Sequence, residues 1–165
     1  MKWNLPNQFF RIWSLIAFIL LYGASRSHAQ SSSPYNINWI NKIGVSSSGN
    51  ILSKNLATHT WTHSGAVSSN LLPENTDGWM EFSTQNGADY IVGFAVNDII
   101  NYSEFSNAIR IHHVGNACST YEGLTNTSLG LWQAGDIFRI SREGNSVKYY
   151  RNGVVLRTVT ANPNL

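Results

Sequence analysis

Apolar and polar side chains alternate most regularly between residues 135 and 158. Residues 137–140 predict a first strand. Residues 146–151 predict a second one, whose odd- and even-numbered side chains point to opposite faces. Asn152-Gly153 is a pair favoured in two-residue hairpins, because both central residues there need a positive φ. The apolar and β-branched run 154–156 is suited to pairing back. The stretch therefore predicts a three-stranded antiparallel meander.

Short strand-like segments occupy much of the remaining chain, and turn signals separate them roughly every 8–12 residues. After residue 30 no span shows sustained helical periodicity. The predicted strands are 36–41, 50–54, 61–69, 78–84, 90–96, 108–112 and 118–122. Residues 44–49 are expected to be a turn-rich break. The pattern predicts an all-β fold, an antiparallel two-sheet sandwich of jelly-roll type.

Some of these segments carry more specific expectations. Residues 90–96 form a near-continuous apolar run, which predicts a central strand covered on both faces. Residues 123–130 are rich in turn formers and are expected to be a loop. The alternation around Trp79 is clean, but it leaves open whether Trp79 or the pair Met80 and Phe82 faces the core.

The N-terminus has the pattern of an export signal. Lys2 and Arg11 precede the apolar run 12–21, and Ser27-His28-Ala29 then provides Ser at −3 and Ala at −1 of a cleavage site. The run is shorter than the roughly 20 apolar residues that span a bilayer. We therefore expect a helical signal peptide over residues 1–29, with an uncleaved membrane anchor as the alternative.

Removal of the signal peptide changes the charge of the chain. The polar linker expected at 30–35 and the domain at 36–165 together contain 8 basic and 9 acidic residues. Their formal net charge is −1, whereas the whole chain carries +2. No Lys or Arg cluster remains, which argues against nucleic acid as a partner. We expect a secreted or cell-surface protein that meets the membrane only through its signal segment during export.

Cysteine does not contribute a cross-link. Cys118 is the only cysteine, so no intrachain disulfide can form, although an exported protein could carry one. A free Cys is usually a small buried apolar residue, and no base or orienting group lies near this one in sequence. The domain therefore depends on its core, which Trp39, Trp61, Trp79 and Trp132 help to fill.

Five segments share a pattern with a known family, namely residues 78–82, 92–94, 121–123, 134–140 and 147–153. Together they resemble the concanavalin A-like lectin and glucanase sandwich, in the branch shared by SPRY-like modules and by β-sandwich repeats of large bacterial surface proteins. Members of that branch carry a GD…I…V.YY.NG meander near the end of the domain. The resemblance covers residues 36–158. Its motifs are mostly structural, so they identify strands and turns and not a ligand site.

The end of the chain departs from that family. In such domains the Asn-Gly hairpin is usually followed by another core strand and a closing strand, whereas this sequence ends at residues 162–165. We therefore expect an N-terminal part of a longer protein that lacks its last strand or strands. A domain that is completed differently is the alternative. A missing strand would expose a sheet edge, which favours association.

Glycoside hydrolysis on such a sandwich needs two carboxylates placed across a groove. Similar enzymes of the laminarinase type carry a Glu-x-Asp-x-x-Glu strand motif, and no such string occurs here. Glu74 and Asp77 have the wrong spacing and lie in a Pro-containing segment. Glu81 has the position of an ordinary solvent-facing strand residue. The sequence therefore predicts no catalytic residue.

Metal ligands are not specified either. His59 and His63 lie four residues apart and His112-His113 are adjacent, but zinc needs three or four convergent ligands. Neither pair brings a further ligand in sequence, so surface or hydrogen-bonded histidines are favoured. The Asp residues are scattered singly and form no calcium loop. We expect no metal and no cofactor.

Aromatic side chains in or near predicted loops are the candidates for ligand binding. A sugar ring stacks on Trp or Tyr, and Asn, Asp or backbone amides bond its hydroxyls. The candidates are Trp61, Tyr102 and Trp132, with Asn101 beside Tyr102. The alternative for each ring is packing in the core, and it is weakest for Tyr102, which lies among polar residues. Asn101 and Asn126 also match the N-glycosylation sequon.

These features predict an exported, non-catalytic binding or adhesion module that recognises a carbohydrate or a cell-surface protein. Two alternatives stay open. One is a glycoside hydrolase of the same fold whose carboxylates come from different strands. The other is a structural spacer domain of a larger surface protein.

Overall fold

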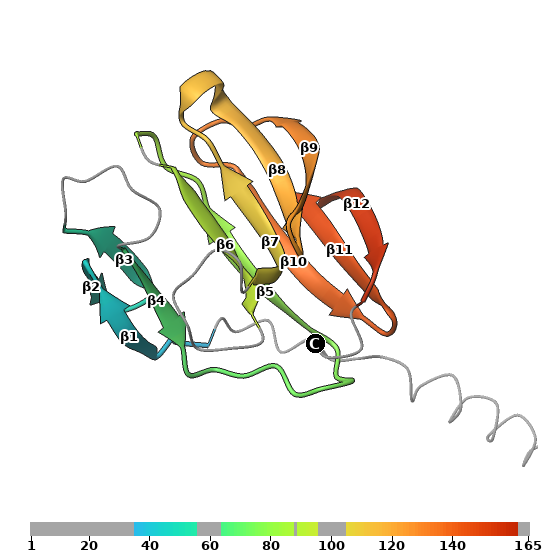
Figure 1. Cartoon of the computed structure of the whole chain (residues 1–165), viewed down its shortest axis with the longest axis horizontal. Helices are drawn as coiled ribbons and strands as arrows, with labels where there is room; N and C mark the ends of the chain where they lie inside the picture. The colour runs from blue at the N-terminus through green and yellow to red at the C-terminus, as the bar shows by residue number, and fades with distance from the viewer. Residues whose placement is uncertain (1–34, 56–63, 88, 96–104, 162–165) are drawn as a thin grey trace, which may run out of the picture. The chain divides into compact units, whose positions relative to one another are not determined.

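The computed structural model describes residues 35–55, 64–87, 89–95 and 105–161, and this part of the chain is built of antiparallel strands (Figure 1). All of these strands belong to the compact unit Asn36–Leu165. The strands are β1 (Trp39–Ile43), β2 (Val45–Ser48), β3 (Ile51–Lys54), β4 (Gly65–Ser68), β5 (Gly78–Ser83), β6 (Tyr90–Ala95), β7 (Phe105–Ile111), β8 (Ala117–Glu122), β9 (Thr125–Leu131), β10 (Ile137–Glu143), β11 (Ser146–Arg151) and β12 (Val154–Thr160). The all-β, antiparallel fold class is confirmed. The signal peptide expected over 1–29 lies outside the described residues.

Eight of the twelve described strands form two four-stranded sheets. Their strand orders are β12-β11-β10-β5 and β6-β7-β8-β9, and two-stranded sheets pair β1 with β4 and β2 with β3. After β5 the chain forms the second sheet as the meander β6 to β9. It then returns to the first sheet with β10, which pairs with β5. The predicted terminal meander is confirmed as β10, β11 and β12.

The two large sheets share one hydrophobic core. Its buried residues come from both of them: Ile109, Ile111, Cys118, Trp132, Phe138, Ile140, Val147 and Tyr149. The rings of Phe82 on β5 and Tyr90 on β6 meet edge to face, with centroids 6.1 Å apart. Met80 and Phe82 pack against this core, which answers the question that the alternation left open: Trp79 lies on the opposite face of β5.

The turns of the meander explain why its sequence is so recognisable. Asn152 and Gly153 have φ of 51° and 81°, as a two-residue hairpin requires. The side-chain oxygen of Asn152 accepts a hydrogen bond from the Ile137 N–H at 2.8 Å. Its amide nitrogen donates to Asp136 at 2.7 Å. The Asp136 and Asn152 of the family-like pattern therefore bind the β11–β12 turn to the start of β10.

Buried polar side chains also connect the two sheets. The Asn107 side chain on β7 donates to the Tyr149 hydroxyl on β11 at 2.8 Å, and Asn107 is only 4% exposed. Glu122 on β8 accepts two hydrogen bonds of 2.8 Å from Arg157 on β12. Burial opposes ionisation of Glu122, but the contacts with Arg157 outweigh it and lower the pKa of Glu122. This inter-sheet bridge, formed by these four residues, fixes one layer against the other.

Three expectations about single elements were wrong. Residues 123–130 were expected to be a loop, but most of them form β9, an edge strand. Its half-buried Thr127 is polar and its Leu131 is exposed, so the usual alternation of apolar and polar residues is missing. Residues 44–49 contain β2, which pairs with β3 despite its three serines. Residues 90–95 lie at the border of their sheet among the described strands, not at its centre. The residues of β6 are at most half-buried, so this apolar run indicated neither the position of the strand in its sheet nor cover on both faces.

Candidate functional site

The outer face of the sheet β12-β11-β10-β5 is the side that points away from the core. Strand alternation places a set of polar and aromatic side chains there, because their neighbours in sequence face inward. Its members on the three strands β5, β10 and β11 are Trp79, Glu81, Arg139, Ser141, Glu143, Lys148 and Tyr150. The register brings together residues that are far apart in sequence.

Arg139 lies at the centre of one row across this face, because it is the register partner of both Glu81 and Tyr150. Its Nε and Nη2 atoms donate to the same oxygen, Oε2, of Glu81, at 3.0 and 2.7 Å. Its guanidinium also lies 4.4 Å from the centroid of the Trp79 ring, a cation–π contact. Among the described residues, Nη1 of Arg139 and Oε1 of Glu81 have no hydrogen-bond partner. Both side chains are about one-third exposed (35% and 34%), so the N–H groups of Nη1 and the Oε1 oxygen are left for a ligand or water.

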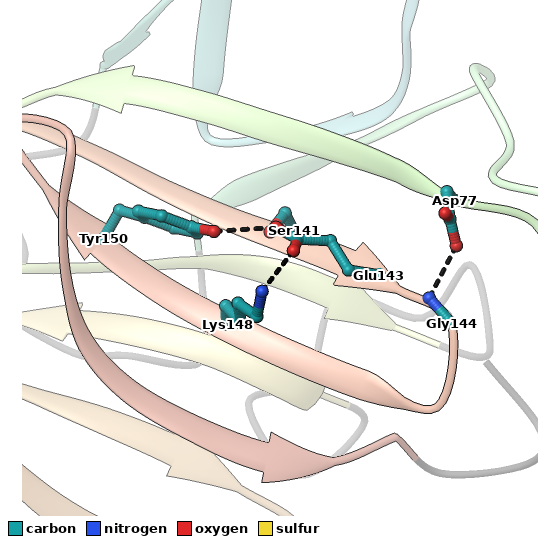
Figure 2. A network of polar contacts seen from close by, with 6 residues as sticks. All are labelled: Asp77, Ser141, Glu143, Gly144, Lys148 and Tyr150. Atoms are coloured by element: carbon teal, nitrogen blue, oxygen red, sulfur yellow. Dashed lines mark hydrogen bonds and ion pairs between the residues drawn. The ribbon is translucent and has the colours of Figure 1, made fainter. Parts of the chain in front are cut away.

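Glu143 holds a second group of side chains in place (Figure 2). Its Oε1 accepts hydrogen bonds of 2.7 Å from the Tyr150 and Ser141 hydroxyls, and the Lys148 ammonium donates to its Oε2. These contacts lower the pKa of Glu143 from its ordinary 4.5 to about 2, and the hydrogen bond from Lys148 has the largest effect. Figure 2 shows the Tyr150 side chain reaching along the sheet toward Glu143. The Tyr150 ring is thus attached to the backbone of β11 at one end and held by the hydrogen bond of its hydroxyl at the other.

A shallow hollow of about 80 Å³ lies where these two groups meet, and Glu81, Ile137, Arg139, Tyr150 and Gly153 line it. Enclosing pockets for small molecules measure roughly 300–1,000 Å³. The hollow can therefore contact one face or edge of a ligand, and it cannot enclose one.

The exposed apolar surface around the hollow adds to this site. Ile137 is 45% exposed, and Val155, the register partner of Tyr150 on β12, is 47% exposed. A fixed aromatic ring beside exposed apolar side chains offers a surface for stacking. The open donor and acceptor of the Arg139–Glu81 pair lie next to it. This arrangement suits reversible binding of a ligand that has both apolar faces and hydroxyl groups.

The side chains on this face are poorly suited to acid catalysis. With a pKa of about 2, Glu143 is ionised at neutral pH and has no proton to donate. Glu81 is engaged with Arg139. Glycoside hydrolysis needs one carboxyl group that stays protonated beside another that is ionised.

The structure gives a clear position for one of the four binding residues predicted from sequence. Trp132 is 1% exposed and packs in the core, where its indole N–H donates to the His112 carbonyl at 2.8 Å. Its ring face is covered, so it takes the core position that was the alternative for each ring. Trp61, Asn101 and Tyr102 lie outside the described residues.

The remaining chemical candidates occupy structural positions where they are described. Cys118 is buried as expected, and burial raises the pKa of its thiol. The Nδ1 atom of His113 lies 3.0 Å from Oδ1 of Asp89, and the same oxygen accepts a hydrogen bond of 2.7 Å from the His113 backbone N–H. Within the described residues, no group of three or more His, Cys, Asp or Glu is placed to hold a metal ion. His59 and His63 lie outside that part.

Sequence reasoning missed Tyr150 and Arg139 as site residues. The alternation from 146 to 151 already placed Tyr150 on the face opposite Val147 and Tyr149. That signal could have singled out a solvent-facing aromatic residue. The contact of Arg139 with Glu81 had no such signal, because 58 residues separate the two and only the β5–β10 register joins them.

The site thus belongs to an all-β domain with an open, aromatic and charged sheet face. Comparison of the chain with protein-family models, with curated proteins and with solved structures found no match. In the part of the chain that the structure describes, no helix has the length and apolarity needed to cross a membrane.

Proposed function

We propose that this chain is an exported, non-catalytic recognition module that binds carbohydrate through the outer face of its β12-β11-β10-β5 sheet. The N-terminal pattern supports export, since it has the basic, apolar and small-residue regions of a cleaved signal. The resemblance of its motifs to the concanavalin A-like sandwich supports a lectin-type or adhesive role. The all-β architecture is compatible with such a sandwich.

One observation carries the proposal. The Tyr150 ring is held along the sheet by its hydrogen bond to Glu143, and it lines the same hollow as the Arg139–Glu81 pair. Pyranose rings have an apolar face that stacks on aromatic rings. Their adjacent hydroxyls take one hydrogen bond from a donor such as Nη1 of Arg139 and give one to an acceptor such as Oε1 of Glu81.

The shape of the site favours an extended or surface-bound glycan. A hollow of about 80 Å³ leaves most of a sugar exposed, so a single monosaccharide gains little buried area. Further sugar units can contact the other polar and aromatic side chains of the outer face. The affinity for one unit is therefore expected to be low, as it is for interfaces that bury little surface.

The test is binding of the exported, purified chain to a glycan array, followed by calorimetry with the oligosaccharide that is retained best. Tyr150→Ala is expected to weaken binding roughly tenfold, because it removes the stacking surface. Tyr150→Phe keeps the ring but loses the hydrogen bond that holds it, so it is expected to bind less tightly than the unchanged chain and more tightly than Tyr150→Ala. Thr125→Ala, an exposed position on β9 in the other sheet, is the matched control.

Two results would overturn the proposal. The first is retention of no glycan by the folded chain, which would favour a spacer role. The second is equal binding by the unchanged chain and by folded Tyr150→Ala. Release of reducing sugar from β-glucans by the same preparation would favour the glycoside hydrolase instead.

A further inference from the structure

Strand β12 has one side that no other described strand covers. It pairs with β11 through six registered positions, and it stands at the border of its sheet (Figure 1). A strand in this position presents backbone N–H and C=O groups that can pair with another chain.

The register identifies which groups face that side. The Ala161 N–H donates to the Asn145 carbonyl at 2.9 Å, so Thr160 and its register partner Ser146 form a pair that does not exchange hydrogen bonds. Such pairs alternate with hydrogen-bonded ones along an antiparallel ladder. The N–H and C=O groups of Thr158 and Thr160 therefore point away from β11, whereas those of Val159 point toward it.

A register shift lies between Val155 and Arg157 of β12, and the part of the edge that follows it lacks the usual protection against pairing. Natural edge strands are commonly blunted by Lys, Pro, bulges or unpaired charges. From Arg157 to Thr160 the strand contains no Lys or Pro, and its one charge, Arg157, is held by Glu122 of the other sheet. Thr158 and Thr160 are both exposed.

Two other described edges are protected by comparison. On β9 the register shifts opposite Cys118 and Ser119, and the Gly130 N–H is bonded to the Ser128 hydroxyl. On β5 the exposed carboxylate Glu81 would lie near its own copy if the strand paired with itself. These features discourage pairing at both edges.

We propose that the edge of β12 pairs with β12 of a second copy of this chain, in antiparallel register. The strand is self-complementary, because Thr158 of one copy then lies opposite Thr160 of the partner subunit, and the reverse holds by symmetry. Thr–Thr pairs across strands are favourable, and no like charges meet. Two-fold dimers with self-complementary interfaces are the commonest protein oligomers. The result is one continuous eight-stranded sheet across the two copies.

The arrangement has a consequence for binding, which rests on the proposed function. Two antiparallel strands of one sheet are related by a two-fold axis perpendicular to the sheet. Both outer faces, and hence both Tyr150 hollows, therefore point to the same side of the dimer. A weak site presented twice on one side would bind a dense glycan surface more tightly than a free oligosaccharide.

The decisive substitution is Thr158→Pro in the exported chain. Proline removes the outward N–H, and it leaves the Val159 hydrogen bonds to β11 in place. Analytical ultracentrifugation is expected to show a concentration-dependent dimer for the unchanged chain and a dimer affinity lower by at least ~tenfold for Thr158→Pro. Thr158→Val keeps the N–H and the β-branched shape, so it should dimerise like the unchanged chain.

Amide hydrogen exchange gives a second measurement that needs no substitution. The Thr158 and Thr160 amides should gain protection as the concentration rises, while the Val159 amide is protected throughout. If Thr158→Pro fails to fold, Thr158→Lys replaces it, since a charge at this position should also block pairing. A chain that is monomeric at every concentration, or a dimer unchanged in folded Thr158→Pro or Thr158→Lys, would overturn the proposal.

The dimer and the glycan site can fail separately. If both hold, Thr158→Pro should bind free oligosaccharide normally and leave a dense glycan surface faster than the unchanged chain. A dimer that binds no glycan would overturn only the proposed function. Glycan binding by a chain that stays monomeric would overturn only the self-pairing.

Discussion

Glu143 shows how much a single side chain can organise. It accepts hydrogen bonds from Ser141, Lys148 and Tyr150, and these contacts stabilise its ionised form. They are local in space and in sequence, since all four residues lie on the β10–β11 hairpin. The sequence placed Lys148 and Tyr150 on one face. It did not show that one carboxylate would bind both.

The stability of the fold should depend on the ionisation of Glu143. Because the pKa of Glu143 is lowered from 4.5 to about 2, its contribution is present above pH 4.5 and is lost as the pH falls toward 2. Glu143→Gln should therefore be less stable than the unchanged chain at neutral pH, and the difference should shrink over that range. Urea denaturation of both proteins as a function of pH measures it.

The same urea denaturation at high salt concentration is the control for this prediction. The Glu143 side chain is 42% exposed, so screening should reduce the contribution of its ion pair with Lys148. Glu122 and Asp89 also have a lowered pKa and contribute to the acid dependence of both proteins. Parallel stability curves for Glu143→Gln and the unchanged chain down to pH 2 would contradict the assignment.

At the scale of elements, the sequence predicted strands best where local chemistry decides them. The Asn152-Gly153 hairpin was predictable, because few residues adopt positive φ without strain. β9 was not, because its half-buried Thr127 is polar and its exposed Leu131 is apolar, which breaks the expected alternation. β2 was missed for a similar reason, since Ser46, Ser47 and Ser48 have little strand propensity of their own and pair only because β3 lies beside them.

Gly93 shows a constraint between two elements that the chain alone does not reveal. A Cβ added to Gly93 on β6 would lie 2.3 Å from the Asn107 carbonyl oxygen and 2.4 Å from the Ala108 Cβ. Both atoms belong to β7, the neighbouring strand. Gly93→Ala should therefore force the two strands apart and lower the free energy of unfolding by about 1–3 kcal/mol. Chemical denaturation measures the loss.

Gly78→Ala is the matched control for this change. Its added Cβ would meet only the side chain of Leu72, whose terminal Cδ1 lies 2.4 Å away and can rotate aside. The cost should be clearly smaller than that of Gly93→Ala. Equal losses for the two variants would show that backbone contact between β6 and β7 is not the cause.

At the scale of the whole molecule, the two sheets are joined by apolar packing and by the inter-sheet bridge. Tyr149 takes part in both, because its ring belongs to the core and its hydroxyl accepts the Asn107 hydrogen bond. Burial, as the main cause, raises the pKa of Tyr149, so the hydroxyl stays neutral at physiological pH.

Removal of this hydroxyl tests the bridge. Tyr149→Phe should lower the free energy of unfolding by about 1–3 kcal/mol, because it leaves the buried Asn107 amide without its partner. Tyr150→Phe deletes a hydroxyl on the outer face of the same strand, and it should cost less because water can replace the lost partner. Urea denaturation of both variants checks the difference. An equal or larger loss in Tyr150→Phe would argue against a buried bridge.

By itself, the sequence determined the all-β class, the terminal meander, the burial of Cys118 and the opposite faces of β11. These follow from periodicity, turn chemistry and the size of side chains, which act over a few residues. Only the tertiary structure decided that Met80 and Phe82 face the core and that Glu81 meets Arg139 across strands. Strand pairing and sheet packing join residues that are distant along the chain, and no local pattern records which segments will become neighbours.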